Sequence, residues 1–181
     1  DGVAAVRRGI ATRRSHAGAA MTVFRALITL LVNGSVEFII VGGAAATAHG
    51  SARLTEVLDV VYRRTQENVA RIVRALARFH PYPRGAPAGL PFRWEERAVW
   101  NGLNFTLTTT LGALDLLGEV TGGGGYDELL PGSIRLRLYG VECFCLSLEH
   151  LIYVKRAAGR PKDLEVIAEL EAILEERNRS G

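Results

Sequence analysis

The sequence has few residues of several types, and each scarcity excludes a class of protein. Its two cysteines, Cys143 and Cys145, form a C-x-C pair too close to cross-link anything useful, and no second Cys or His pair completes a zinc site. On a strand both thiols point to one face, so we expect them to be reduced and partly buried, as in a reducing cytoplasm. No apolar run approaches the ~18–20 residues that span a bilayer, so we expect a cytoplasmic protein with no membrane partner.

An excess of positive charge is also missing from most of the chain. The formal net charge is +3. Residues 1–20 account for it, because they contain four arginines and one aspartate, and the remaining residues balance. A general electrostatic footprint for DNA or RNA is therefore absent from the body of the sequence, and only a local basic patch stays open.

Methionine occurs once, at Met21, and apolar periodicity begins immediately after it. We expect residues 1–20 to be a flexible tail, either upstream of the natural start or a native extension. Residues 21–181 are long enough to form a single domain with its own core.

Apolar periodicity predicts an α/β (α+β) fold, with helices packed on a small mixed sheet and a helical pair at the C-terminal end. Strands are expected at Val36–Val41, Glu56–Tyr62, Asn104–Thr110, Gly112–Val120, Ile134–Tyr139 and Val141–Leu146. Helices are expected at Thr22–Asn33, Ala44–His49, Thr65–Phe79, from the cap Ser147 to Ala158, and at Lys162–Arg177, the last with Leu164, Ile167, Leu170, Ile173 and Leu174 facing inward. The proline-rich His80–Pro91 and the glycine-rich Thr121–Tyr126 are expected to be loops.

Two acidic residues stand inside otherwise apolar strands. Asp59 lies in the strand that follows Gly42-Gly43, and Asp115 lies among leucines two strands later. A carboxylate in such a place is costly unless it is paired, hydrogen-bonded or bound to a metal. Two of them on neighbouring strands, beside a Gly-Gly turn, indicate a site for Mg²⁺ or Mn²⁺. Incidental polar contacts at a strand edge are the alternative.

Three stretches together resemble the nucleotidyltransferase superfamily, which has the DNA polymerase β-like fold. Within it the chain is most similar to the minimal bacterial nucleotidyltransferases of the toxin–antitoxin type. The stretches are GGAAATAHGSARLTEVLDVV, LGALDLLGEVTGGGGYDELL and SLEHLIYVKRAAGRPKDLEVIAEL.

This resemblance implies Mg²⁺-dependent transfer of a nucleotide from a nucleoside triphosphate to a hydroxyl of a protein, an RNA or a small molecule. By position, Asp59 and Asp115 would be the catalytic carboxylates and metal ligands. Gly42, Gly43, Ser51 and Lys155 would bind the nucleotide. Lys155 and Lys162 are the only lysines in the chain, and the alternative for both is a helix-end charge near backbone carbonyls.

The sequence departs from the family signature at Val57, where the first metal-binding aspartate is expected. Glu56 cannot stand in for it without a register shift, because alternate strand residues face opposite ways. Three functions therefore stay open. The chain is a nucleotidyltransferase with impaired activity, or a catalytically degenerate, antitoxin-like regulator that binds a nucleotide, a toxin partner or a second copy of itself. The third is a structural domain whose carboxylates are incidental.

Overall fold

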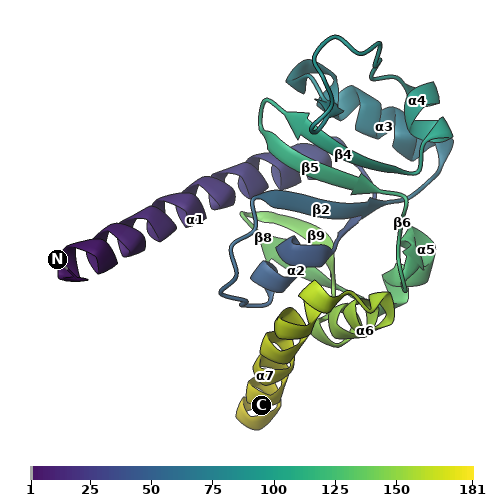
Figure 1. Cartoon of the computed structure of the whole chain (residues 1–181). Coiled ribbons are helices and arrows are strands. Elements are labelled where there is room, and N and C mark those ends of the chain that lie inside the picture. The colour runs from purple at the N-terminus through teal and green to yellow at the C-terminus, as the bar shows by residue number, and fades with distance from the viewer. Residues whose placement is uncertain (1) are drawn as a thin grey trace.

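The computed structural model describes the backbone of residues 2–181 and the side chains of residues 16–181. Over these residues the protein is mixed α/β, with a seven-stranded sheet and seven α-helices (Figure 1), which confirms the expected class. The strands of the sheet are, in spatial order, β3 (Tyr82–Pro83), β4 (Asn104–Thr109), β5 (Gly112–Leu117), β2 (Val57–Tyr62), β1 (Phe38–Ile40), β9 (Val141–Leu146) and β8 (Ser133–Leu138). A separate two-stranded ribbon joins β6 (Glu119–Val120) to β7 (Gly124–Gly125).

The sheet is mixed because two of its strand pairs are parallel. β2 runs parallel to β5, and β1 runs parallel to β9. The other four pairs are antiparallel, including the predicted hairpin of β8 and β9, which turns at Tyr139 and Gly140 with positive φ at both residues. The parallel pairing of β2 with β5 sets their two acidic residues at the same level of the sheet.

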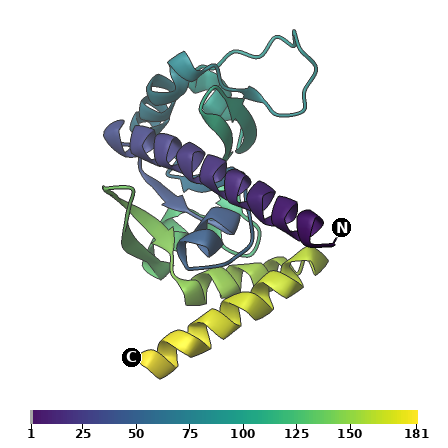
Figure 2. The same ribbon diagram turned by 90° about the vertical axis from the view of Figure 1, so that its left-hand side faces the viewer.

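Helices cover both faces of the sheet. α1 (Gly2–Asn33) contacts β5, and its Val23 lies so close to Gly112 that a Cβ at Gly112 would collide with it. Successive residues of a strand face opposite ways, and Gly112 and Asp115 are three residues apart on β5. Gly112 faces α1, so Asp115 faces the opposite side of the sheet. α2 (Gly42–Ala48) lies on the Asp115 side and contacts α6 (Leu148–Ala158), and α7 (Leu164–Ser180) packs on α6 (Figure 2). The expected C-terminal helical pair is therefore present. The remaining helices are α3 (Gln66–Leu76), α4 (Glu96–Asn101) and α5 (Tyr126–Leu129).

α1 contains one stretch, His16–Asn33, that is long and apolar enough to cross a membrane by length and composition alone. A core helix passes the same test, and the last turns of α1 bury Phe24, Leu27, Ile28 and Leu31 against the sheet. The flexible tail expected over residues 1–20 falls mostly on residues 1–15, whose side chains lie outside the described residues, so it stays a prediction.

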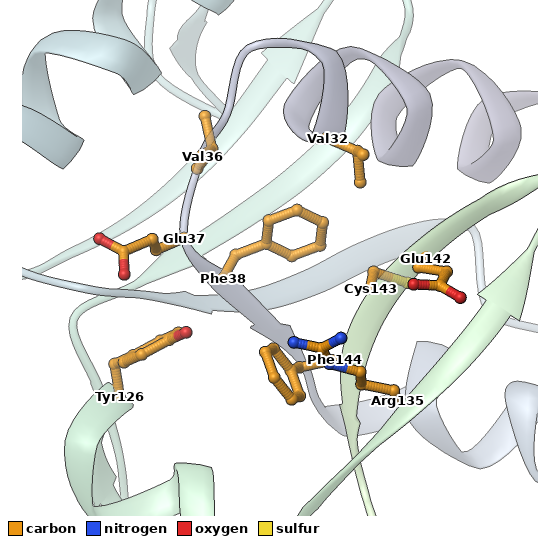
Figure 3. A pocket seen from close by; sticks show the side chains of 9 residues that line it. All are labelled: Val32, Val36, Glu37, Phe38, Tyr126, Arg135, Glu142, Cys143 and Phe144. Carbon is orange, nitrogen blue, oxygen red and sulfur yellow. The ribbon is translucent and has the colours of Figure 1, made fainter.

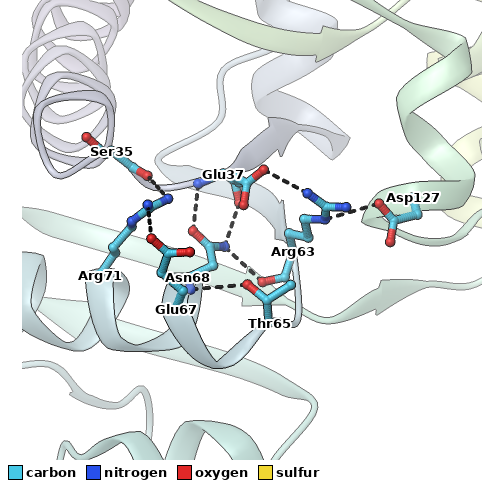
Figure 4. Close-up of polar contacts among 8 residues, drawn as sticks. All are labelled: Ser35, Glu37, Arg63, Thr65, Glu67, Asn68, Arg71 and Asp127. Carbon is cyan, nitrogen blue, oxygen red and sulfur yellow. Dashed lines mark hydrogen bonds and ion pairs between the residues drawn. The ribbon is translucent and has the colours of Figure 1, made fainter.

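The first turn of α3 joins the edges of β1 and β2 through Asn68, which is fully buried. Its Oδ1 accepts from the Glu37 N–H at 2.7 Å, and its Nδ2 donates to the carbonyls of Glu37 and Arg63 at 2.9 and 2.8 Å (Figure 4). Thr65 caps this helix by accepting from the Asn68 N–H, as predicted. One amide side chain therefore completes backbone hydrogen bonds where the strand pairing ends.

Several predicted boundaries were wrong. β1 covers only Phe38–Ile40, because the Glu37 N–H goes to Asn68 instead of a strand. Gly42 and Gly43, expected in a turn, form the first turn of α2. The loops predicted at His80–Pro91 and Thr121–Tyr126 contain the short strands β3 and β7, and α4 was not predicted.

One predicted core residue was also wrong. Leu164 is 67% exposed, whereas Ile167 and Leu170 are buried. Leu164 is the first residue of α7, directly after a 3₁₀ turn, and no described element covers this end of the helix.

Candidate functional site

Asp59 and Asp115 lie side by side on neighbouring strands. The parallel register of β2 and β5 pairs Asp59 with Asp115, and the antiparallel register of β5 and β4 pairs Asp115 with Thr106. The Arg84 N–H donates to the Thr106 carbonyl at 2.8 Å, which continues the pairing of β3 with β4. Directly paired residues share one face of a sheet. One row of side chains therefore crosses four strands: Asp59, Asp115, Thr106 and Arg84.

The Gly-Gly pair makes room for the Asp59 carboxylate. Gly42 has a φ of +59°, and a Cβ at this position would collide with the Asp59 carboxylate. The Gly43 N–H donates to Asp59 Oδ2 at 3.1 Å. Both glycines line the cavity described below, and their predicted role at a triphosphate stays a prediction. In this structure their contact is with Asp59.

The Asp59 carboxyl is largely buried, and burial is the main reason why its pKa rises from 3.8 to about 6. The negative charge of Asp115 raises it further, while the hydrogen bond from Gly43 and the charges of Lys155 and Arg84 oppose the rise. A carboxylate in this state gains from any additional cation nearby, because the cation offsets both the desolvation and the repulsion.

Asp115 already has a cationic partner. Arg84 Nη2 lies 2.6 Å from Asp115 Oδ1, with side-chain exposures of 32% and 20%. Arg84 follows β3, in the segment predicted to be a loop. Sequence reasoning gave Arg84 no role, because the register that connects it to Asp115 passes through β4.

A cavity of about 370 Å³ opens beside the two aspartates. Figure 1 shows the elements that surround it, with α2 over β2 and α6 next to α2. Its lining includes Gly42, Gly43, Asp59 and Asp115 from the sheet side, and Lys155, Arg160, Lys162 and Asp163 from α6 and the segment that follows it. The cavity thus contains three carboxylates, one of them paired with Lys155, and three basic side chains.

Lys155 of α6 is fixed by an ion pair with Asp163, the last residue of the 3₁₀ turn (Pro161–Asp163) that leads into α7. Its Nζ lies 2.9 Å from Asp163 Oδ1, and the two side chains are 14% and 11% exposed. Lys155 therefore lines the cavity, as its predicted role requires, and its ammonium is paired with a carboxylate instead of a helix-end carbonyl.

Ser51 does not line this cavity. It is buried in the segment after α2, and its hydroxyl accepts from the Arg53 N–H at 3.2 Å. Glu169 of α7 holds the same segment by accepting from the Ala52 N–H at 2.7 Å and from Arg53 Nε at 3.2 Å. The structure therefore separates Ser51 from the other predicted nucleotide-binding residues.

His49, next to this segment, is packed instead of open to a ligand. It is buried, its Nε2 lies 2.7 Å from the Leu146 carbonyl, and Arg177 Nη2 donates to its carbonyl at 2.9 Å. Burial, followed by the charge of Arg177, lowers its pKa from 6.5. His49 therefore packs between α2, β9 and α7.

Val57 lies two residues before Asp59 on β2, so the two side chains share a face. Among the described residues, no group of three or more His, Cys, Asp or Glu side chains could hold a metal ion. The aspartate pair nevertheless fits one divalent cation, since its adjacent oxygens are of the type that Mg²⁺ binds and phosphate oxygens can complete the coordination. A third carboxylate, at position 57, is what the pair lacks.

A second cavity, of about 340 Å³, is lined by residues at the start of β1 and on β8 and β9 (Figure 3). Its wall includes the rings of Phe38, Tyr126 and Phe144, with the Arg135 guanidinium 5.3 Å from the Phe144 ring centroid. Glu37, also in the wall, is paired with Arg63 at 3.0 Å. The predicted site residues all lie elsewhere.

A comparison with models of known protein families and a search of curated proteins each found no match.

Proposed function

We propose that the cavity beside Asp59 and Asp115 binds a nucleoside triphosphate with one divalent cation, and that the chain is a nucleotidyltransferase-like protein whose transfer activity is weak. One observation carries the proposal: two adjacent carboxylates, Asp59 and Asp115, line the same cavity as three basic side chains. A metal–triphosphate complex has this pattern of charge, with a cation for the carboxylates and anionic oxygens for the basic groups.

The acidic and the basic residues of the cavity would bind different parts of the metal–triphosphate complex. Asp59 and Asp115 would hold the cation from adjacent strands. Among the described residues neither Arg160 nor Lys162 forms an ion pair with an acidic side chain, so both are available to the phosphates. Mg²⁺, when bound, neutralises phosphate charge and lowers the pKa of a coordinated hydroxyl.

Val57 makes slow transfer the expected result. It sits on the face of β2 where a further carboxylate would complete the cation site, and an isopropyl group offers no oxygen. Loss of one metal ligand removes several kcal/mol of transition-state stabilisation, roughly 100-fold or more in rate. The same observation favours a second candidate function, a regulator that binds the nucleotide or a protein partner without turning it over.

The test combines calorimetry with a transfer assay. The wild type is titrated with each of the four nucleoside triphosphates in Mg²⁺ and in EDTA, and then incubated with labelled nucleotide, Mg²⁺ or Mn²⁺, and protein, RNA and small-molecule acceptors. We expect Mg²⁺-dependent binding of at least one triphosphate and slow label transfer.

Val57→Asp is expected to raise the transfer rate about 100-fold, because it supplies the missing ligand. Val57→Asn is the matched control, because asparagine has the shape of aspartate without its negative charge. Binding in the wild type with transfer only in Val57→Asp would select the regulator. If no triphosphate binds under either condition, the proposal is wrong.

A further inference from the structure

The row of paired residues on the sheet ends in a cation that belongs to the chain itself. Arg84 is at one end of the row and Asp59 is at the other. Asp115 lies between them, paired with Asp59 in the strand register and with Arg84 in an ion pair. The Arg84 guanidinium donates to Asp115 Oδ1 at 2.6 Å and to the Leu107 carbonyl at 3.3 Å. Without a ligand, Arg84 therefore supplies the positive charge that a metal ion would supply to Asp115.

The backbone of Arg84 is anchored, so only its side chain has freedom to move. Its N–H is bonded to Thr106, and the segment that follows is tied back by the Tyr82 hydroxyl, which donates to the Pro87 carbonyl at 2.6 Å and accepts from the Leu90 N–H at 3.2 Å. The Tyr82 ring also packs edge-on against Phe92, at a centroid distance of 6.0 Å. The hydrogen-bonded segment from Tyr82 to Leu90 therefore fixes the position from which the Arg84 guanidinium reaches Asp115.

Two cations cannot share Asp115 without cost. A divalent ion on the Asp59–Asp115 pair would lie within a few ångströms of the guanidinium, and like charges at such distances repel strongly in a partly buried site. Arg84 is 32% exposed and has five N–H donors in a planar fork that suits phosphate oxygens. Displaced from Asp115, it has a second acceptor as soon as a phosphate is in the cavity.

We propose that Arg84 is an exchangeable positioning residue, which neutralises Asp115 in the free protein and transfers to a phosphate oxygen when a divalent cation takes the aspartates. This inference rests on the proposed function. It makes triphosphate and metal binding mutually dependent, since the ion releases the guanidinium and the phosphates receive it.

The exchange predicts effects of opposite sign for Arg84→Gln. Affinity for Mn²⁺ alone, measured by electron paramagnetic resonance, is expected to rise about tenfold, because the competing charge is gone. Affinity for the triphosphate in Mg²⁺, measured by calorimetry, is expected to fall about tenfold, because a charge-assisted hydrogen bond is lost. A purely structural arginine would not strengthen one ligand and weaken the other.

Arg78→Gln is the matched control, because it removes the same charge six residues away, where the guanidinium lies over the Phe79 ring. It is expected to change neither affinity. Unchanged triphosphate affinity in Arg84→Gln, or weaker Mn²⁺ binding, overturns the exchange while the proposed function stands. A wild type that binds neither ligand overturns both.

A second pair of variants covers the case in which Arg84→Gln does not fold. Asp115→Asn frees the guanidinium, so triphosphate affinity in EDTA is expected to rise about tenfold, and Asp115→Asn with Arg84→Gln is expected to lose that gain. The double variant removes both members of the Arg84–Asp115 ion pair, so neither charge is left without the other. A gain that persists in the double variant would come from the lost aspartate charge alone and would refute the exchange.

Discussion

Asp59 is the residue at which the stability of the fold and the proposed chemistry oppose each other. Its carboxyl is buried beside a second carboxylate, and the conformation of Gly42 is built around it. Such a residue destabilises the folded protein when it ionises and is useful only if a cation is to be bound. The cost should be measurable without knowing any ligand.

We expect Asp59→Asn to stabilise the protein at neutral pH and to have little effect in acid. The folded-state pKa of about 6 exceeds the ordinary 3.8, so the folded protein holds this proton more tightly than the unfolded chain. The free energy of unfolding therefore falls as pH rises from about 4 to 6 and is lowest above that range. At about 1.4 kcal/mol per unit, the asparagine variant should be more stable by about 3 kcal/mol at pH 7.5 and by little at pH 4.

Urea denaturation at the two pH values checks this expectation. Asp127→Asn is the control, because Asp127 is 67% exposed and is not part of the lining of the aspartate cavity. An Asp59→Asn effect of equal size at both pH values would refute the assignment of the pKa.

At the scale of elements, α3, α6, α7 and the strand hairpin were predictable, whereas β3, β7, α4 and the start of α1 at Gly2 were not. α3 has a full apolar stripe, with Val69, Ile72 and Leu76 buried, and a capping threonine. β3 and β7 are two residues each, and α4 is six, which is too short for any periodicity to show. They form because a neighbouring strand or helix is already in place, and a neighbour in space is not visible in the local sequence.

The α6–α7 pair depends on an interaction between elements. We expect Lys155→Met to cost about 3 kcal/mol of unfolding free energy, because it leaves the buried Asp163 carboxylate without its partner. Adding Asp163→Asn should recover much of the loss, since the double variant buries no lone charge. Chemical denaturation of the single and double variants measures the coupling, and strictly additive losses would show that the pair contributes nothing.

At the scale of the whole molecule, α1 is unevenly buried over the residues whose side chains are described. Within residues 16–33 the first buried side chain is Phe24, and residues 16–22 are exposed or half-buried. We therefore expect a chain that starts at Met21 to fold, with an unfolding free energy within about 1 kcal/mol of the full chain. Leu27→Ala in the full chain is the contrast, expected to lose about 2–5 kcal/mol because Leu27 is fully buried.

Circular dichroism and thermal unfolding of the three proteins decide the matter. A Met21 chain that fails to fold would mean that the first turns of α1 stabilise the domain, and that residues 1–20 are no tail.

The sequence by itself determined the class of fold and the strands that carry Asp59 and Asp115. These follow from local pattern, since burial imposes periodicity and a lone carboxylate stands out in an apolar strand. Only the tertiary structure decided which charges meet. The parallel register of β2 and β5 brings the two aspartates together. Pairing of Arg84 with Thr106 on β4 places its guanidinium beside Asp115. The turn between α6 and α7 places Asp163 beside Lys155. Each of these contacts joins residues from different elements, and electrostatic partners are set by distance in space, which no local pattern encodes.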